Sequence, residues 1–182
     1  FQGNTLEEHI KELTIDEKLD IIIKIVEALD FIHDKDILHR DIKPENILIN
    51  ENKEVKLIDF SLANLKENKI NDKTLGSFNY ISPEQTGLLR RPIDNRSDLY
   101  SLGAVMYEFF YGNPPFEDED VGKIIHMHLA KTPDPAPKLD VPYDTELSNI
   151  IFKLLQKEPS NRYQQAQGLL EDLKFIKKNP GK

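Results

Sequence analysis

The sequence HRDIKPENIL, residues His39–Leu48, is followed at short range by LIDFS, residues Leu57–Ser61. Residues 47–50 and 54–58 are runs rich in apolar, β-branched side chains, and three polar residues separate them. This pattern is typical of a short β-hairpin. Because a hairpin brings its two ends together, we expect the polar residues just before and just after these runs to lie close in space.

Side chains suited to phosphoryl transfer stand at these two ends. Phosphoryl transfer needs mainly positioning and charge neutralisation. The Asp41 carboxylate can accept a proton from a hydroxyl, and the Lys43 ammonium can offset negative charge on a migrating phosphoryl group. Asn46 and Asp59 can converge on one ion and supply the oxygen ligands that Mg²⁺ prefers.

The ordered set of His-Arg-Asp, Asn, a hairpin and Asp-Phe-Ser resembles the catalytic loop and metal-binding segment of eukaryotic-type protein kinases. The resemblance implies ATP and Mg²⁺ as cofactors, Asp41 and Lys43 as catalytic residues, and Asn46 and Asp59 as metal ligands. It further implies that Leu48 forms the floor of an adenine pocket, although a place in the hairpin core also explains it. By the same resemblance, the residues expected to contact ATP are Asn4, Glu45, Asn46, Leu48 and Asp59.

Residues 62–84 resemble a kinase activation segment that closes with Ser82-Pro83-Glu84 in place of Ala-Pro-Glu. The polar stretch 64–79 predicts a mobile loop. Ser77 stands where Ser/Thr kinases carry a hydroxyl residue that contacts the catalytic Asp and Lys; a plain turn residue is the alternative. Thr74 is a candidate for phosphorylation, with Arg40 to receive the phosphate, or else an unmodified loop residue.

The periodicity of apolar residues predicts a mainly helical α+β fold with one small hairpin. Helices are expected at Thr5–Glu12, from Thr14 to about Asp34, from Ser97, at Asp120–Lys131 and at two stretches near the C-terminus, with an extended segment at Thr132–Pro142. His126 and His128 are two residues apart, so they do not share a helical face. We expect them to be surface or interface residues and not a metal pair.

The resemblance also gives two architectural expectations. Asp98 matches the residue that holds the backbone of the catalytic loop in kinases, and its place in the first turn of a helix favours a negative charge in any case. Arg162 matches the arginine that pairs with the glutamate of the Ala-Pro-Glu motif, here Glu84.

The resemblance covers residues 1–182 but only the larger, C-terminal lobe of a kinase domain. It divides the chain into the end of the hinge at 1–6, the catalytic loop and metal-binding segment at 37–61, and the activation segment at 62–84. The glycine-rich loop, strand lysine and helix glutamate of the small lobe have no counterpart in the sequence, so the missing small lobe is an expected partner.

A narrower likeness concerns Tyr80–Gly87, the insert 88–95 and the Asp-Phe-Ser motif. They resemble the kinase domains of large bacterial hybrid proteins that combine a Ser/Thr kinase with an ATPase-like module, a sensor domain and a histidine kinase. This likeness implies further signalling domains in the same chain. Kinases usually have glycine at the position of Ser61. Because serine allows fewer backbone conformations than glycine, Ser61 is expected to restrict the movement of Asp59.

Composition limits the possible functions. The 182 residues suffice for one domain with a core. A formal charge of −8 argues against binding nucleic acid or an anionic membrane as the main role. The absence of cysteine excludes disulfides, thiolate catalysis and cysteine-based zinc sites, and is compatible with the cytoplasmic location that we expect. No apolar run is long enough for membrane insertion.

Three functions fit these motifs to different degrees. A Ser/Thr kinase acting on a protein substrate is favoured because Asp41, Lys43, Asn46 and Asp59 are all present. A non-catalytic, kinase-like scaffold or input module has no physical need to keep all four. A small-molecule phosphotransferase shares the Asp, Asn and metal Asp, but its chain lacks the Ser-Pro-Glu segment and the Asp98 helix.

Overall fold

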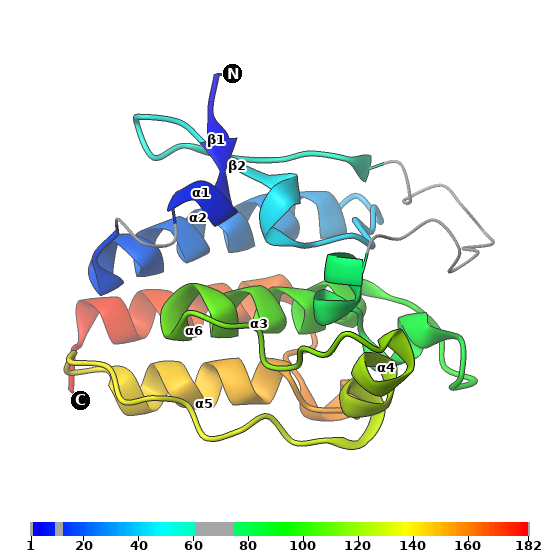
Figure 1. Cartoon of the computed structure of the whole chain (residues 1–182). Helices are drawn as coiled ribbons and strands as arrows, with labels where there is room; N and C mark the ends of the chain where they lie inside the picture. Colours follow the sequence, from blue (N-terminus) through cyan, green and yellow to red (C-terminus); the bar gives the residue numbers. More distant parts are fainter. Residues whose placement is uncertain (1, 10–12, 61–74, 182) are drawn as a thin grey trace.

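The computed structural model describes residues 2–9, 13–60 and 75–181 of the chain. Its body consists of four long helices, in which α2 packs against α3 and α6, and α5 packs against the same two helices (Figure 1). The expected mainly helical fold is therefore confirmed. The bounds of these helices are α2 Ile15–His33, α3 Asn95–Tyr111, α5 Asp144–Leu154 and α6 Ala166–Lys178.

Helix α2 begins and ends where the sequence predicts. The Thr14 hydroxyl accepts the N–H of Glu17, and the Glu17 carboxylate accepts the N–H of Thr14 at 2.9 Å, so the two residues form a capping box. The apolar residues at helical spacing, Leu19, Ile22, Val26 and Leu29, are fully buried. The helix ends at the cap residue Asp34, a few residues before the His39–Asn46 loop.

Helix α3 is the buried centre of the molecule, as its nearly continuous apolar surface predicts. The side chains of Leu99, Leu102, Val105 and Phe109 are fully buried. Gly103 lets α5 approach closely, because a Cβ atom at this position would lie only 2.7 Å from the Cβ of Leu154. The carboxylate of Asp94 caps the helix by accepting the N–H of Arg96.

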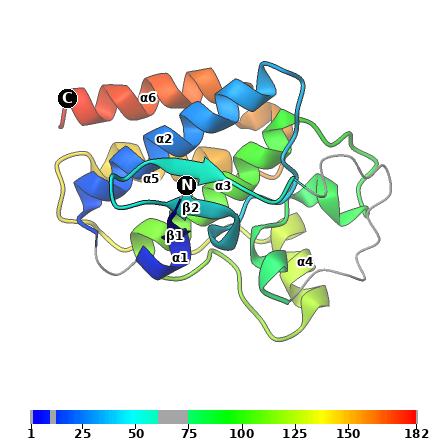
Figure 2. The ribbon, with the colours of Figure 1, turned by 90° about the horizontal axis from the view of Figure 1, so that it is seen from above.

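A small antiparallel sheet lies over α2 (Figure 2), with strand order β1-β2-β3. The predicted hairpin is confirmed as β2 (Ile47–Ile49) and β3 (Val55–Leu57). The expected helix Thr5–Glu12, with Asn4 or Thr5 as its cap, begins at Leu6 as α1 (Leu6–His9). The strand β1 (Asn4–Thr5), which pairs with the free edge of β2, was not expected. Residues 10–12 lie outside the described part.

Helix α4 (Val121–Ala130) lies near one end of α3 (Figure 1). It packs against two 3₁₀ turns, η4 (Leu75–Tyr80) and η5 (Pro83–Thr86). Two further turns are η1 (Pro44–Asn46) and η6 (Pro159–Asn161). The predicted loop 64–79 is described only from residue 75 onward, where the chain forms η4. The segment 132–142, which was expected to be extended, contains no helix or strand. Within the described ranges, no helix has the length and apolar character that a membrane span needs.

The two histidines of α4 differ in exposure. His126 is exposed, as expected, whereas the side chain of His128 is fully buried, so the expectation of a surface or interface residue is wrong for His128. The reason is tertiary: the face of α4 that carries Ile124 and His128, four residues apart, packs against η4 and α3.

Candidate active site

The carboxylate of Asp98, on α3, holds the backbone of the His39–Asn46 loop. The N–H groups of His39 and Arg40 donate to Asp98 Oδ2 and Oδ1, at 2.9 and 2.8 Å. Arg40 has a φ of 66°, in the left-handed region that costs a non-glycine residue energy. The paired hydrogen bonds offset this cost, so the expectation that Asp98 holds the backbone of this loop is confirmed.

A second side chain reaches Asp98 from the end of α2. His33 Nε2 lies 2.8 Å from Asp98 Oδ2, and the side chains of both residues are at least nine-tenths buried. Because a carboxylate only accepts hydrogen bonds, Nε2 is the protonated nitrogen of His33. The sequence alone does not predict this contact, although the last turn of a helix, where His33 lies, favours a positively charged side chain.

The buried side chain of His39 joins the loop to the residues after β3. Its Nδ1 accepts the N–H of Asp41 at 3.2 Å, and its Nε2 donates to the carbonyl of Ile58 at 2.8 Å. Its ring also packs against Phe60, with ring centroids 4.5 Å apart. His39 therefore ties Asp41 to the segment that carries Asp59. Sequence reasoning used His39 only as part of a motif and missed this structural role.

The structure brings Asp41, Lys43 and Asn46 together. Asn46 Nδ2 donates to the Asp41 carbonyl at 2.8 Å and to Asp41 Oδ2 at 3.1 Å. Lys43 Nζ lies 3.8 Å from Asp41 Oδ2, and both side chains are partly accessible, at 16% and 13%. A carboxylate held in this way is oriented by Asn46 and neutralised by Lys43, yet it can still meet a ligand from solvent.

The hydroxyl of Ser77 reaches the same group of side chains from η4. Lys43 Nζ donates to Ser77 Oγ at 2.8 Å, so the part of the expected contact that involves Lys43 is confirmed. Ser61, Thr74 and most of the segment 62–84 lie outside the described residues. The part that is described, from residue 75 onward, places Ser77 beside Lys43.

Asn46 and Asp59 lie on the two chain segments that flank the hairpin, and the structure joins these segments. The N–H of Ile58 donates to the Asn46 carbonyl at 2.9 Å. Asp59 follows with a φ of 61° and is an exposed residue. Because the amide nitrogen of Asn46 faces Asp41, its side-chain oxygen is the atom left for a cation, and this donor set suits Mg²⁺.

These two side chains alone do not complete a metal site. Among the described residues, no group of three or more His, Cys, Asp or Glu side chains could hold a metal ion. Mg²⁺ requires octahedral oxygen coordination, so the remaining oxygen atoms have to come from water and from a bound ligand.

The other residues expected at the nucleotide lie at the sheet and in η1. Leu48 is the half-buried middle residue of β2, between Thr5 of β1 and Lys56 of β3. Asn4 is exposed on β1, next to Ile49. Glu45 is exposed in η1, directly before Asn46.

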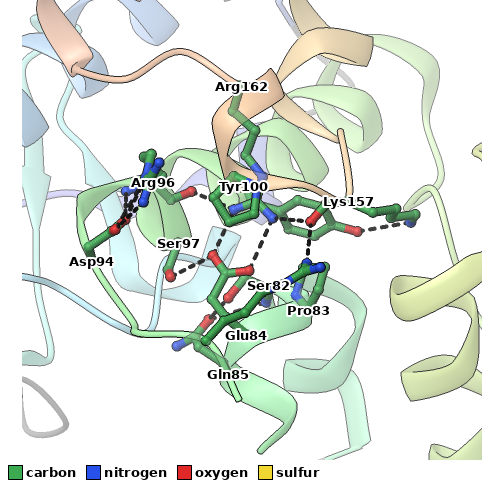
Figure 3. Close-up of polar contacts among 12 residues, drawn as sticks. Ser82, Pro83, Glu84, Gln85, Asp94, Arg96, Ser97, Tyr100, Lys157 and Arg162 are labelled. Carbon is green, nitrogen blue, oxygen red and sulfur yellow. Dashed lines mark hydrogen bonds and ion pairs between the residues drawn. The ribbon is translucent and has the colours of Figure 1, made fainter. Parts of the chain in front are cut away.

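The segment after η4 is anchored in the core by an ion pair (Figure 3). Arg162 Nη1 and Nη2 donate to the Glu84 carboxylate at 2.7 and 3.0 Å, and Ser97 Oγ donates to the same carboxylate at 2.7 Å. Burial opposes ionisation of Glu84, but Arg162 and Ser97 hold its pKa below the usual value. The expected pair between Glu84 and Arg162 is therefore confirmed.

Gln85 connects this anchor to the His39–Asn46 loop. Its side-chain Nε2 donates to the carbonyl of Arg40 at 2.8 Å, while its Oε1 accepts from the Ser82 N–H and hydroxyl. The role of Gln85 was not predicted from the sequence. Its position three residues after Ser82 is the spacing of a capping box and could have drawn attention to it.

The chain is similar to known proteins over most of its length. A family model described as the protein kinase domain matches residues 1–173. A probable serine/threonine-protein kinase of Clostridium perfringens is 36% identical over 185 residues, which cover 98% of this chain and 27% of that protein. The serine/threonine-protein kinase PknB of Mycolicibacterium smegmatis is 38% identical over 160 residues, and its namesake in Mycobacterium tuberculosis is 35% identical over 166 residues. These cover 85% and 88% of the chain, but only 25% and 26% of the relatives.

Proposed function

The chain belongs to the protein kinase family, and we propose that it forms the large lobe of a serine/threonine kinase that transfers the γ-phosphoryl group of ATP to a protein hydroxyl. The chain spans about a quarter of the length of the three curated relatives described above. The small lobe and the further signalling domains implied by the narrower likeness to hybrid bacterial proteins are part of the proposal, as is a cytoplasmic location, where ATP is available.

The observation that carries this proposal is the contact geometry of Asp41, Lys43 and Asn46. Asp41 would accept the proton of the acceptor hydroxyl, because Asn46 holds its carboxylate in one orientation. Lys43, placed between Asp41 and Ser77, would bring a positive charge to the phosphoryl group. A scaffold would not need these three side chains to contact one another.

Asn46 and Asp59 would hold Mg²⁺, and Leu48 and Asn4 would contact the adenine and ribose, with Glu45 close to the nucleotide. Bound Mg²⁺ supplies neutralisation of the phosphate charge. The chain's own contribution is to fix the two ligands, since Asn46 is 5% exposed and is joined to the Asp59 segment through Ile58.

Phosphoamino acid analysis tests the reaction class. The intact protein is incubated with Mg-ATP and a mixture of Ser, Thr and Tyr peptides. We expect phosphoserine and phosphothreonine, and no phosphotyrosine. The absence of transfer, or transfer of equal size from an Asp41→Asn variant, would contradict the proposal and favour a scaffold.

A further inference from the structure

The peptide unit between Arg40 and Asp41 is held from both sides. Its carbonyl oxygen, which belongs to Arg40, accepts a hydrogen bond from Gln85 Nε2 at 2.8 Å. Its N–H group, which belongs to Asp41, donates to His39 Nδ1 at 3.2 Å. The donor to the carbonyl comes from a segment 45 positions further along the chain. Gln85 is therefore a side chain from outside the His39–Asn46 loop that fixes the plane of the peptide leading into Asp41.

This peptide unit needs support because of the backbone conformation that precedes it. Arg40 has a φ of 66°, which is unfavourable for a residue that carries a side chain. Asp98 holds the N–H group of Arg40, but a carboxylate only accepts hydrogen bonds and so cannot hold a carbonyl. The donor of Gln85 fills this gap. A rotation of the peptide would break its hydrogen bonds to Gln85 and His39, and would change the two torsion angles that lead into Asp41.

The position of the Asp41 carboxylate depends on this backbone. Asn46 Nδ2 donates to the Asp41 carbonyl at 2.8 Å and to Asp41 Oδ2 at 3.1 Å. Lys43 Nζ lies 3.8 Å from the same carboxylate oxygen. Both contacts require the backbone of Asp41 to stay in place. Because a misplacement of about 1 Å can cost about 10²-fold in rate, a hydrogen bond that fixes this backbone is expected to matter for turnover.

Ser82 sets the orientation of the Gln85 side chain (Figure 3). Gln85 Oε1 accepts from the N–H group of Ser82 at 3.2 Å and from its hydroxyl at 3.0 Å. Because both groups donate to the oxygen, the amide nitrogen is the atom that faces the Arg40 carbonyl. Ser82 is fully buried and stands in place of the alanine of the Ala-Pro-Glu motif. Its hydroxyl thus supplies a donor that alanine lacks.

The backbone that carries this pair of side chains is itself fixed. Glu84, directly before Gln85, accepts two hydrogen bonds from the buried guanidinium of Arg162. The N–H group of Gln85 donates to the Ser82 carbonyl at 3.1 Å, which closes the turn η5. The amide of Gln85 is therefore presented to the Arg40 carbonyl from a rigid element, as the positioning of a catalytic group requires.

We propose that Gln85 and Ser82 are positioning residues for the catalytic base. Gln85 holds the Arg40 carbonyl and so keeps Asp41 where its carboxylate accepts the proton of the acceptor hydroxyl. Ser82 keeps the amide nitrogen of Gln85 on that carbonyl. Because both side chains bind protein groups, their loss should lower turnover and leave the affinity for ATP unchanged. The inference rests on the proposed kinase activity and deepens it, since it makes catalysis depend on the end of the activation segment.

Steady-state kinetics of the intact protein with Mg-ATP and a Ser/Thr peptide test this role. Gln85→Glu keeps the size of the side chain but cannot donate to the carbonyl, and Gln85→Met removes the donor without adding charge. Gln167→Glu makes the same change at an exposed glutamine of α6 as a matched control. We expect both Gln85 variants to lower kcat about tenfold, the size of one hydrogen bond, with the KM for ATP unchanged.

Ser82→Ala tests the orienting part of the proposal. The variant keeps the backbone N–H group that donates to Gln85 Oε1 and loses only the hydroxyl. We therefore expect a smaller fall in kcat, about twofold to threefold. The double variant Ser82→Ala with Gln85→Met should be no slower than Gln85→Met alone, because Ser82 acts through Gln85. Independent, multiplying effects of the two changes would overturn the orienting role.

Amide hydrogen exchange of residues 39–42 in the same intact proteins separates this role from the kinase proposal. Faster exchange there in both Gln85 variants, but not in Gln167→Glu, would support the hold on the loop even if the wild type proved inactive. Unchanged exchange in this segment, or wild-type kcat in the Gln85 variants of an active protein, would overturn the proposal. A uniform rise in exchange over the whole chain, with kcat and the KM for ATP changing together, would also overturn it, because that result describes a general loss of stability.

Discussion

Arg162 and Glu84 form a bidentate ion pair in the interior, with Nη1 2.7 Å from Oε1 and side-chain exposures of 0% and 1%. The two residues are 78 positions apart in the sequence. The pair therefore fastens the segment after η4 to the turn before α6. Because Gln85 follows Glu84 and donates to the carbonyl of Arg40, the anchor also supports the His39–Asn46 loop.

Breaking this pair should be strongly destabilising. Glu84→Gln leaves the Arg162 charge buried without a carboxylate, and we expect a loss of about 3–5 kcal/mol in the free energy of unfolding. The exposed pair of Lys174 and Glu27, with exposures of 52% and 48%, provides a matched control. Glu27→Gln should cost less than about 1 kcal/mol. Denaturant unfolding of the two variants compares them, and equal losses would contradict the structural role of the buried pair.

Asp98 should matter for both stability and activity. In Asp98→Asn the side-chain amide has one acceptor oxygen in place of two, so it loses at least one of its hydrogen bonds from His39, Arg40 and His33. We expect a cost of about 1–3 kcal/mol and a fall in turnover, because Arg40 is then less firmly held in its left-handed conformation. Unfolding and kinetic measurements on the same samples check both effects. Wild-type values for stability and turnover would show that the loop does not depend on this carboxylate.

The alkaline pH dependence of stability should report on Lys157. Burial, with Arg162 nearby, lowers the pKa of Lys157 from 10.5 to about 8. Between these values the unfolded chain binds more protons than the folded chain, so the fold becomes more stable as pH rises. Below pH 8 both states are protonated and the cost of burying the charge is constant. Relative to Lys157→Met, the wild type should gain about 1 kcal/mol between pH 8 and 10, after allowance for solvent screening. A difference that is independent of pH in this range would contradict the lowered pKa.

Mg²⁺ should bind only together with a nucleotide. Asn46 and Asp59 supply two ligand groups, and Mg²⁺ needs octahedral oxygen coordination. Isothermal titration of the intact protein with MgCl₂ alone should give no binding at micromolar concentration, whereas titration in the presence of a non-hydrolysable ATP analogue should. Tight binding of Mg²⁺ to the protein alone would mean that other residues complete the site.

Features that depend on local pattern could be predicted from the sequence. The hairpin around residues 51–53 and the capped start of α2 at Thr14 follow from the spacing of neighbouring residues. The contacts of Asp98 and Arg162 are long-range, and they could be predicted only because a family resemblance supplied them. The contact between Lys43 and Ser77 was likewise predicted from the family resemblance.

The remaining features depend on packing that no local pattern contains. Asn4 and Thr5 form a strand because β2 offers a free edge, and residues 4–5 alone do not encode this. The spacing of His126 and His128 shows that they face different directions, but not which one faces the core. The hydrogen bonds that join Lys157, Tyr100 and His128 likewise appear only once α3, α4 and the segment after α5 are placed together.

Asp41 is the residue on which the proposed function depends most directly. The measurement is turnover of a Ser/Thr peptide by the intact protein and its Asp41→Asn variant, alongside the affinity of each for ATP. Asn keeps the shape of the side chain and removes the base. We predict a fall in turnover of about 10²-fold or more with little change in nucleotide affinity. Wild-type turnover in the variant would contradict the role of Asp41 as the catalytic base. It would also contradict the interpretation of the His39–Asn46 loop as the catalytic centre.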